Sequence, residues 1–441
     1  MAEGVKGGPG PAGGPLAIGI AGLGTVGVGV VRLLAEHGDL LAARCGRRIV
    51  VAAVSARARG RERGIDLSGV RWHDDARSLA ADEGVDAVVE LIGGADGIAL
   101  ELCQAAFAHR KPVVSANKAL IAHHGTALAA AAEGAGVTLG YEAAVAGGIP
   151  VVKALREGLA GNRIERVYGI LNGTCNYILT MMREEGRELA EILAEAQALG
   201  YAEADPGFDI DGVDTAHKLA ILASLAFGTR VDFAGIHVEG IREVGALDIR
   251  YAGELGYHIK LLGIASRTAH GIEQRVHPCM VSIDAPIAHV DGVFNAVAVE
   301  GDFVGGTMLG GRGAGAGPTA SAVVADLVDI ARGRTMPVFG IPAATLERTP
   351  TAPMGRHVGA YYIRLMVVDR PGVMAGVTAA LRDEAVSVEA LIQRGRNPDD
   401  VVPVVLTTHE TREAAMMRAL ARIAKLDSMR QPPRAIRIEK L

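Results

Sequence analysis

One apolar run that ends in a glycine-rich turn constrains the fold of this chain most. Leu16 to Gly22 (LAIGIAG) has the composition of a buried parallel strand. A G-x-G-x-x-G turn follows at Gly22, Gly24 and Gly27, and then a helical pattern, VGVGVVRLLAEHG. In this context the first glycine permits a tight turn, the second lets the backbone approach a pyrophosphate, and the third lets helix pack on strand. The sequence therefore predicts a dinucleotide-binding unit at the start of the chain.

The segment after the second predicted strand indicates which dinucleotide is bound. That strand is 48–55 (RIVVAAVS), and an NAD site usually has an acidic residue at its end. Here Arg57, Arg59 and Arg61 follow, and residues 55–61 include no acid. Because guanidinium groups suit a 2′-phosphate, NADP is favoured, while NAD stays possible. A solvated basic loop is the alternative for these arginines.

Two later strand ends offer further candidates for ligand binding. A strand at 112–115 ends in Ser115-Ala-Asn117-Lys118, at the edge where open α/β sheets bind ligands. Another strand is predicted to run into Glu142, and the loop from there to Pro150 is rich in glycine. One carboxylate with several carbonyl oxygens suits a hard cation. A hinge between domains is the alternative for this loop.

The acidic stretch 196–218 (AQALGYAEADPGFDIDGVDTAHK) carries the strongest candidates for chemistry. Pro206 and three glycines make a helix unlikely before Gly212. From Val213 the pattern turns helical, which places Asp214 and Lys218 on one face. Such an arrangement can hold an ammonium-bearing substrate next to a proton donor.

Three simpler roles compete for the acidic stretch. A calcium loop is excluded, because Val213 and Ala220 stand where such a loop needs ligands. A solvated loop fits poorly, because Tyr201, Phe208 and Ile210 lie among the acids and suit a closed pocket. An ordinary surface ion pair between Asp214 and Lys218 stays open from these two residues alone.

The same stretch resembles the signature of homoserine dehydrogenases. The matching positions are Ala196, Gly200, Tyr201, Asp205, Pro206, Asp209, Ile210, Gly212, Asp214 and Lys218. The resemblance covers nearly the whole chain after residue 15. It points to the monofunctional form, because a first strand at Leu16 leaves no aspartate kinase in front. It implies reversible, NAD(P)-dependent oxidation of L-homoserine to L-aspartate 4-semialdehyde, in threonine, methionine and isoleucine biosynthesis.

The resemblance also implies the residues of the site. Catalysis is expected from Lys218, Lys118 and Asp214, with Lys218 as the first candidate for the proton donor. Expected substrate-binding residues are Glu203, Asp209, Tyr201, Gly173 and Thr174. Expected cofactor-binding residues are Gly22, Gly24, Thr25, Val26, Gly27, Arg57, Ser115, Lys118 and Gly315. A monovalent cation, Na⁺ or K⁺, is expected at Glu142, Val145, Gly147 and Ile149.

The predicted fold class is α/β, with three domains. A Rossmann-type nucleotide domain precedes an α+β substrate and dimerisation domain and a ferredoxin-like βαββαβ domain. The last resembles ACT regulatory domains, with Asp369-Arg-Pro-Gly372 at its first strand–helix turn. Expected boundaries are a flexible tail at 1–15, the nucleotide domain at 16–150 with 310–335, the catalytic domain at 151–309, a linker at 336–358, and the ACT domain at 359–441. Threonine is the expected effector, and a homodimer or homotetramer the expected assembly.

Composition excludes several other classes of protein. A net charge of −5 over 441 residues argues against a nucleic-acid binder, and no apolar run has the length of a membrane span. The four scattered cysteines fit a reducing cytoplasm. Two alternative functions remain at this stage. One is a semialdehyde dehydrogenase with Cys175 as its nucleophile, and the other is a non-catalytic sensor that retains a nucleotide domain.

Overall fold

The chain divides into two units that helix α10 (Val213–Phe227) connects. The computed structural model describes residues 14–394 and 400–441, so the tail predicted at 1–15 lies, up to residue 13, outside the described residues. The first unit comprises Met1–Val167, His217–Ala234 and Asn295–Thr349. The second comprises Tyr168–Ala216, Gly235–Phe294 and Pro350–Leu441. Helix α10 therefore begins in the second unit and ends in the first.

A six-stranded sheet in the order β3-β2-β1-β4-β5-β6 forms the centre of the first unit. Its strands are β1 (Leu16–Ala21), β2 (Ile49–Ser55), β3 (Arg71–Trp72), β4 (Ala87–Glu90), β5 (Val113–Ser115) and β6 (Leu139–Gly140). All five neighbouring pairs are parallel. This order reverses direction between β1 and β4, which confirms the predicted Rossmann-type fold and marks the ligand-binding edge of the sheet.

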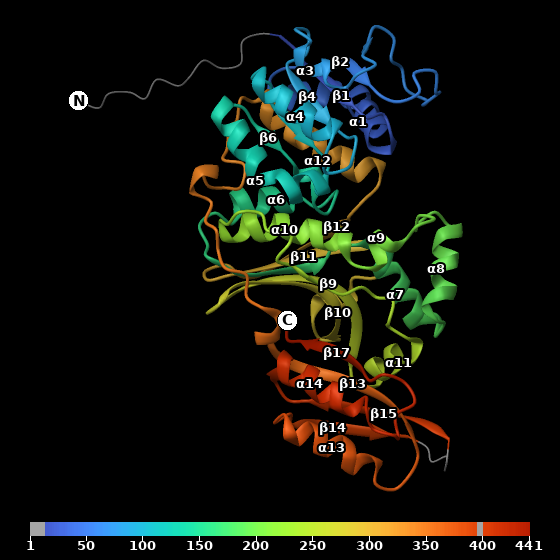
Figure 1. The fold of residues 1–441 in the computed structure, drawn as a ribbon. Coiled ribbons are helices and arrows are strands. Elements are labelled where there is room, and N and C mark those ends of the chain that lie inside the picture. The colour runs from blue at the N-terminus through green and yellow to red at the C-terminus, as the bar shows by residue number, and fades with distance from the viewer. Residues whose placement is uncertain (1–13, 395–399) are drawn as a thin grey trace, which may run out of the picture. The chain divides into compact units, whose positions relative to one another are not determined.

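Helices cover both faces of this sheet (Figure 1). They are α1 (Thr25–Glu36), α2 (Gly38–Cys45), α3 (Ser78–Ala81), α4 (Ile98–Ala108), α5 (Lys118–Ala135) and α12 (Ala316–Ala331). Ile18 and Ile20 of β1 share one buried cluster with α1, α2 and α12. Gly19 points to the opposite face, where an added Cβ would lie 3.1 Å from Leu79 of α3. Strand alternation thus gives β1 two buried faces.

The first unit also contains strands of a second sheet and several short elements. Strands β12 (Gly305–Arg312), β11 (Phe294–Gly301) and β7 (Ile164–Ile170) are neighbours in this second sheet. The loop after β6 contains the 3₁₀ turn Glu142–Ala144, helix α6 (Val151–Lys153) and the wide turn Ala154–Gly158. The prediction that a strand runs into Glu142 was wrong, because β6 ends at Gly140.

The second unit is built on the strand order β9-β10-β17-β13-β15-β14. The strands are β9 (Tyr257–Thr268), β10 (Gly271–Ser282), β13 (Val358–Val368), β14 (Val388–Gln393), β15 (Val401–Thr408) and β17 (Arg434–Glu439), with short β8 (His237–Val238) and β16 (Thr411–Arg412) beside them. Its helices are α7 (Gly173–Glu185), α8 (Leu189–Ala198), α9 (Gly207–Ile210), α11 (Ala246–Glu254), α13 (Val373–Asp383) and α14 (Glu413–Ile423).

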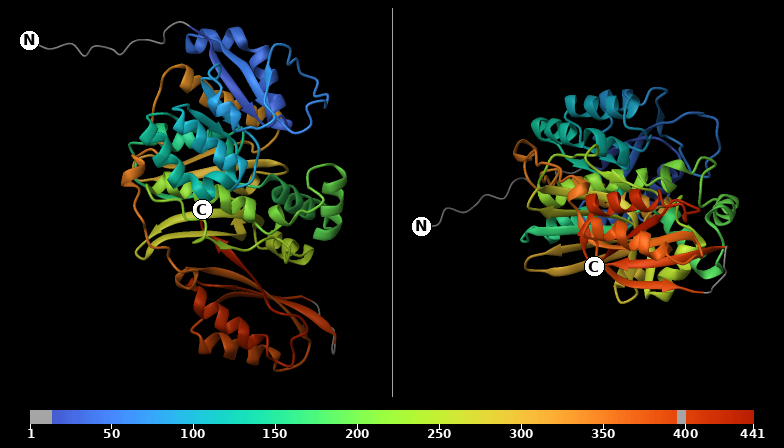
Figure 2. Two further views of the ribbon diagram at one scale, coloured as in Figure 1. Left: turned by 45° about the horizontal axis from the view of Figure 1, so that its top comes forward. Right: turned by 60° about the horizontal axis from the view of Figure 1, so that its bottom comes forward.

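The last part of the second unit has the predicted βαββαβ order, with the four strands arranged β17-β13-β15-β14. Alternate residues of β13 (Tyr361, Ile363, Leu365) pack with α13 and α14 in one core. Both helices therefore cover the same face of this sheet, as Figure 2 also shows. On the other face, Tyr362 and Arg364 bind Asp248 of α11.

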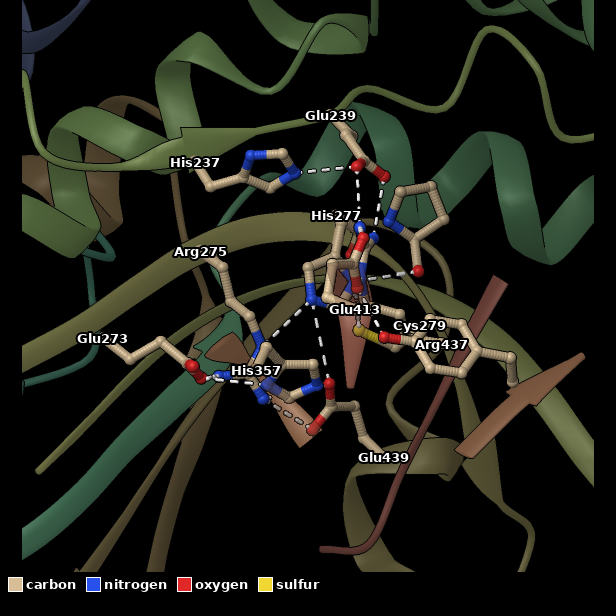
Figure 3. A network of polar contacts seen from close by, with 12 residues as sticks. His237, Glu239, Glu273, Arg275, His277, Cys279, His357, Glu413, Arg437 and Glu439 are labelled. Carbon is tan, nitrogen blue, oxygen red and sulfur yellow. Dashed lines mark hydrogen bonds and ion pairs between the residues drawn. The ribbon is translucent and has the colours of Figure 1, made fainter. Parts of the chain in front are cut away.

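Strand β17 also pairs with β10, so the ferredoxin-like part and the β9–β10 hairpin share one continuous sheet. We call the place where β17 pairs with β10 the seam, and a network of ion pairs lies there (Figure 3). Arg437 of β17 binds Glu239 at 2.8 and 2.9 Å and Glu413 at 2.9 and 2.6 Å. Burial opposes the charge of Arg437, but the hydrogen bonds to Glu239 and Glu413 raise its pKa. The seam therefore holds its charges as tightly paired ions.

One local prediction fails at the acidic stretch. The prediction that no helix forms before Gly212 was wrong, because α9 forms one turn over Gly207–Ile210. Pro206 directly precedes this turn, where its missing N–H removes no hydrogen bond. Its carbonyl accepts from the amides of Asp209 and Ile210, each at 3.0 Å. No helix among the described residues is long and apolar enough to cross a bilayer.

Candidate active site

The three glycines of the first turn occupy the positions that a dinucleotide site requires. Gly22 has φ +104, and a Cβ there would lie 2.5 Å from the carbonyl oxygen of Leu91. A Cβ on Gly27 would lie 2.1 Å from the carbonyl oxygen of Gly22. By contrast, a Cβ on Gly24 would meet nothing within 4 Å. Gly22 and Gly27 are thus fixed by the chain itself, while Gly24 faces open space at the N-terminus of α1, beside Thr25 and Val26.

A chain of buried hydrogen bonds fixes the carboxyl ends of β4 and β5. Glu90 is fully buried and accepts from the Ser115 hydroxyl at 2.6 Å and from the Ile92 amide at 2.7 Å. The Ser115 oxygen in turn accepts from the Asn117 amide at 3.0 Å. Asn117 caps α5 by accepting from the Leu120 amide. Through this chain of contacts Glu90 sets the start of α5.

Lys118 is the first residue of α5, and its position is electrostatically unusual. A cation at a helix N-terminus opposes the helix dipole, so the lysine does not serve helix stability there. The hydroxyl group of Ser115 is hydrogen-bonded to Glu90. A ligand at the end of β5 would therefore meet the backbone of Ser115 and not its side chain. The turn between β5 and α5 therefore presents Lys118 at the ligand-binding edge of the sheet.

The arginines after β2 have different tasks. Arg63 donates to the backbone oxygens of Leu23, Arg57, Ala58 and Arg61, at 2.7–3.3 Å. Arg59 and Arg63 both lie over the Trp72 ring, 5.8 and 5.6 Å from its centroid. Arg57 is exposed just beyond the end of β2. Arg63 therefore holds the loop, and Arg57 and Arg61 are exposed within it.

The Glu142 loop is buried and strained. Both carboxylate oxygens of Glu142 accept backbone amides, from Val152 at 2.9 Å and Lys153 at 2.8 Å. Burial and the nearby Asp326 raise the pKa of Glu142 to about 7. Ala146 and Gly147 both have positive φ, at 55 and 49. A Cβ on Gly147 would lie 2.4 Å from the carbonyl oxygen of Gly313, two residues before Gly315.

This loop fits a monovalent cation in its chemistry. The buried Glu142 lies near a second carboxylate, Asp326, and two such groups are stabilised by a nearby positive charge. Lys153 supplies part of that charge, because it forms ion pairs with Asp326 and Asp329. Val145 and Ile149 are both fully buried within the same loop. The donor set of one carboxylate and several backbone oxygens is the kind that hard cations prefer.

In the second unit, one asparagine joins the two aspartates of the acidic stretch. The Asn172 side-chain amide donates to Asp209 Oδ1 and to Asp214 Oδ2, each at 2.8 Å. Its carbonyl oxygen accepts from the Cys175 amide at 2.8 Å, which caps α7. Asn172 and Asp214 are buried and Asp209 is partly exposed, so a buried carboxylate and a partly exposed one are held close together. Such a cluster suits a ligand that carries an ammonium group.

Other predicted substrate residues lie around the start of α7 and the loop before α9. Gly173 is the first residue of α7, and the Thr174 hydroxyl donates to the carbonyl oxygen of Tyr201 at 3.0 Å. The Tyr201 ring lies 5.0 Å from that of Tyr177, while Glu203 is exposed. The structure thus brings Thr174 and Tyr201 together.

Asp214 and Lys218 do not form an ordinary surface pair. They are 2% and 8% exposed, so both belong to the buried side of α10. Exposed ion pairs on helices contribute little and rarely require burial of a lysine. This burial removes the surface-pair alternative that the sequence left open.

Comparison with known proteins agrees with this geometry. Residues 22–142 match the description "Homoserine dehydrogenase, NAD binding domain", residues 150–328 match "Homoserine dehydrogenase", and residues 361–425 match "ACT domain". The homoserine dehydrogenase of Neisseria gonorrhoeae is 46% identical over 97% of this chain and 99% of its own, as is that of Pseudomonas aeruginosa. The chain belongs to the homoserine dehydrogenase family.

Solved structures support the same assignment. A homoserine dehydrogenase crystal structure from Thiobacillus denitrificans matches with a TM-score of 0.91 and 45% identity, over 96% of this chain and 98% of that one. A hyperthermophilic archaeal homoserine dehydrogenase in complex with NADPH matches with a TM-score of 0.63 and 26% identity, over 73% and 99%. This chain is thus an oxidoreductase of the homoserine dehydrogenase family, with an NAD(P)-binding domain and an ACT domain.

Sequence reasoning missed three residues of this homoserine dehydrogenase. Glu90 and Asn117 set the position of Lys118, and Asn172 joins Asp209 to Asp214. Glu90 had a detectable signal, because it is a charged residue that ends an otherwise apolar strand. Asn172 has no comparable signal for its contact with residues 37 and 42 positions later, because that contact forms only when the chain folds.

The structure also argues against Cys175 as a nucleophile. Its side chain is fully buried, and the thiol donates to the carbonyl oxygen of Asp209 at 3.2 Å. A reactive thiol needs exposure and a group that stabilises the thiolate. Cys175 is therefore a residue that packs against the segment carrying Asp209. The semialdehyde dehydrogenase alternative is left without a reactive nucleophile at this position.

Proposed function

We propose that this chain catalyses the reversible oxidation of L-homoserine to L-aspartate 4-semialdehyde, within threonine, methionine and isoleucine biosynthesis. The observation that carries the proposal is the cluster of Asn172, Asp209 and Asp214. Its carboxylates suit the ammonium group of an amino-acid substrate. Glu203, Tyr201, Gly173 and Thr174 complete the proposed substrate site.

Lys218 is the proposed proton donor and acceptor. When bound, the dinucleotide accepts a hydride from the hydroxyl-bearing carbon of homoserine, or returns it in the reverse direction. As that carbon is oxidised, neutral Lys218 takes the hydroxyl proton, and in the reverse direction it gives the proton back to the developing alkoxide. Asp214, one helical turn before Lys218, orients the lysine or the substrate ammonium. Lys118 is the proposed second lysine of the site.

NADP is the proposed cofactor, with NAD as a weaker substitute. Arg57 supports this choice, because it is an exposed guanidinium where NAD sites place an acid. The proposed contacts to the rest of the dinucleotide come from Gly22, Gly24, Thr25, Val26, Gly27, Ser115, Lys118 and Gly315. Na⁺ or K⁺ is the proposed ion of the loop that holds Glu142, Val145, Gly147 and Ile149.

Threonine is the proposed effector of the ACT domain. Its charged groups would be held near the Asp369–Gly372 turn, where two ACT domains pair in a homodimer or homotetramer. Gly372 has φ +93, and an added Cβ there would meet nothing within 4 Å, so a ligand can approach its backbone closely. The proposed domain boundaries are those expected from the sequence. A reducing cytoplasm is the proposed setting, because none of the four cysteines is in a disulfide.

An NADPH oxidation assay with L-aspartate 4-semialdehyde tests the proposed reaction. Turnover without added phosphate, together with NADP reduction by L-homoserine, is the expected result. A requirement for phosphate would instead indicate an acylating semialdehyde dehydrogenase. Absence of turnover with either substrate would indicate a sensor protein.

A further inference from the structure

A mixed-charge cavity lies in the second unit where three segments meet. Its volume is about 390 Å³. The segments are the acidic stretch at Asp211, the segment at 239–248 that runs into α11, and the start of β17 at 433–436. Sites for small ligands begin at roughly 300 Å³, so the cavity has room for a small molecule and not for a nucleotide.

The cavity wall carries two ion pairs. Arg242 binds Asp211 through Nε–Oδ1 and a second contact at 2.9 Å, and Arg434 binds Glu243. The four side chains are 37–64% exposed, so both pairs are open to exchange with a ligand. The wall therefore offers two guanidinium forks and two carboxylates at one place.

This pattern selects one chemical class of ligand. A guanidinium fork matches a carboxylate group through two parallel hydrogen bonds, and a carboxylate matches an ammonium group. A zwitterion can replace both internal partners at once, while an anion or a cation alone would leave one pair of wall charges unsatisfied. Val244, Pro278 and Ile436 supply the apolar part of the lining.

The residues that line the cavity are in direct contact with the acidic stretch that carries Asp209. The Ile241 amide donates to the carbonyl oxygen of Ile210 at 2.8 Å, and a Cβ on Gly240 would lie 2.1 Å from that oxygen. Ile210 lies between Asp209 and Asp211, within the stretch that ends at Asp214. A change in the segment at 239–248 therefore shifts the backbone that carries Asp209.

The lining of the cavity also includes residues of the ACT domain and residues bound to it. Glu239 lines it and is held by Arg437 of β17, and Arg434 begins the same strand. Burial would raise the pKa of Glu239, but hydrogen bonds from His237 and Arg437 lower it well below its usual range. A ligand in the cavity would thus contact groups anchored to the ACT domain and groups anchored to the acidic stretch.

We propose that this cavity is a regulatory site for a small zwitterionic α-amino acid, separate from the Asp369–Gly372 turn. The ligand carboxylate binds Arg242 and Arg434, and its ammonium group binds Asp211 and Glu243. Occupancy changes the affinity of the enzyme for its amino-acid substrate through Ile210 and Asp211, since an effector acts only through its different affinity for two states. The effect on substrate rests on the proposed function, whereas binding itself does not.

The test uses the full-length enzyme and a panel of the twenty L-α-amino acids at millimolar concentration. Thermal shift identifies ligands, and calorimetry gives their Kd. We expect at least one amino acid to bind, and its N-acetyl and carboxamide derivatives to lose binding. In Glu243→Gln with Arg434→Gln the Kd should rise about tenfold or more, because charge-assisted hydrogen bonds are lost. Both side chains are exposed enough for the variant to fold.

Two control variants make the result specific. Arg418→Gln removes an exposed guanidinium that binds Glu384 elsewhere in the second unit, and it should leave the Kd unchanged. Asp369→Asn alters the turn proposed for threonine and should also leave it unchanged. The proposal is overturned if no amino acid binds, or if the double variant binds as tightly as the wild type. Because calorimetry needs no turnover, a failure of the proposed reaction would be recognised separately.

Discussion

The side-chain amide of Asn172 donates to Asp214 Oδ2 at 2.8 Å, across 42 residues of sequence. The same amide donates to Asp209 at 2.8 Å, so one asparagine keeps the buried Asp214 and the partly exposed Asp209 at a fixed spacing. Carboxylates this close repel each other unless donors separate them. The proposed substrate site therefore depends on a helix cap as much as on its acidic residues.

Replacing Asn172 should separate its two roles. Asn172→Asp keeps a capping oxygen but adds a third carboxylate, whereas Asn172→Ala loses both functions. We expect kcat/KM for homoserine to fall about 10–100-fold in both variants, because hydrogen bonds to charged groups are lost. The alanine variant should also lose about 1 kcal/mol of stability from the missing cap, whereas the aspartate variant should be destabilised by repulsion among three neighbouring carboxylates. Steady-state kinetics and denaturant unfolding measure the two effects, and Asn162→Ala, at a loop in the first unit, serves as the control.

Lys218→Ala should lower kcat far more than it raises KM. Proton transfer contributes in the transition state, and a typical general acid supplies about 10²–10⁴-fold. The Kd for NADP, measured by fluorescence titration, should stay near the wild-type value. Lys425→Ala, an exposed lysine at the end of α14, is the matched control. Near-normal kcat in Lys218→Ala would remove this lysine from the mechanism.

Arg57 and Arg63 should affect cofactor use differently. Arg57→Gln, alone or with Arg59→Gln, should raise KM for NADP and spare NAD, because only NADP carries the extra phosphate. Arg63→Gln should weaken both cofactors, because Arg63 holds the loop backbone through four hydrogen bonds. Parallel assays with both dinucleotides give the ratio. Equal losses in the Arg57 variant, or a strong NAD preference in the unaltered enzyme, would contradict the proposed role.

Glu142 should make stability depend on pH and on monovalent cations. Its pKa is raised to about 7 by burial and by Asp326, from an ordinary value of 4.5. The folded state then holds the proton more tightly than the unfolded state, so the contribution of Glu142 to stability falls as pH rises from about 4.5 to about 7. A bound K⁺ or Na⁺ favours the ionised carboxylate and should reduce this loss.

Thermal unfolding across that pH range, with and without KCl, measures the effect. Tetramethylammonium chloride is the control for ionic strength. Glu142→Gln cannot titrate, so its pH dependence over this window should be shallower and should not respond to K⁺. An identical response to K⁺ in the wild type and in this variant would remove Glu142 from the cation site.

The sequence predicted the parts of this molecule that depend on local rules. Gly22 and Gly27 lie in a turn whose spacing alone marks it, and the βαββαβ order follows from the alternation of apolar residues in each strand. The helix start at Asn172 and the onset of α10 at Val213 are equally local. Short stretches of sequence are therefore enough to place these elements.

What the sequence could not predict depends on contacts between distant segments. Asn172 meets Asp209 and Asp214 only after the chain has folded, and Arg437 meets Glu239 across 198 residues. Pairing of β17 with β10 has no sequence signal either, because both strands have partners within their own βαββαβ part or hairpin. Side-chain amides and guanidinium groups at such seams are visible only in three dimensions.

The seam between β17 and β10 alters how regulation by threonine should be tested. Deletion from about residue 350 onward is expected to leave turnover and abolish threonine inhibition, because the catalytic chemistry needs no βαββαβ part. It also strips β17 from β10 and leaves Glu239 without Arg437. Loss of this strand pairing and of the ion pair should also make the truncated enzyme unfold at a lower temperature. Size measurements and thermal unfolding must therefore accompany its kinetics.

Asp369→Asn gives a cleaner test of the threonine site. Asp369 lies in the turn before α13 and accepts a hydrogen bond from Gln393 at 3.3 Å, which an asparagine oxygen can also accept. The variant loses only the charge that would meet an ammonium group, so threonine inhibition should weaken about tenfold while the melting temperature stays unchanged. Asp427→Asn, an exposed aspartate in the same domain, is the control. If the intact enzyme ignores millimolar threonine and calorimetry detects no binding, threonine is not its effector, and the ACT domain serves assembly or senses another ligand.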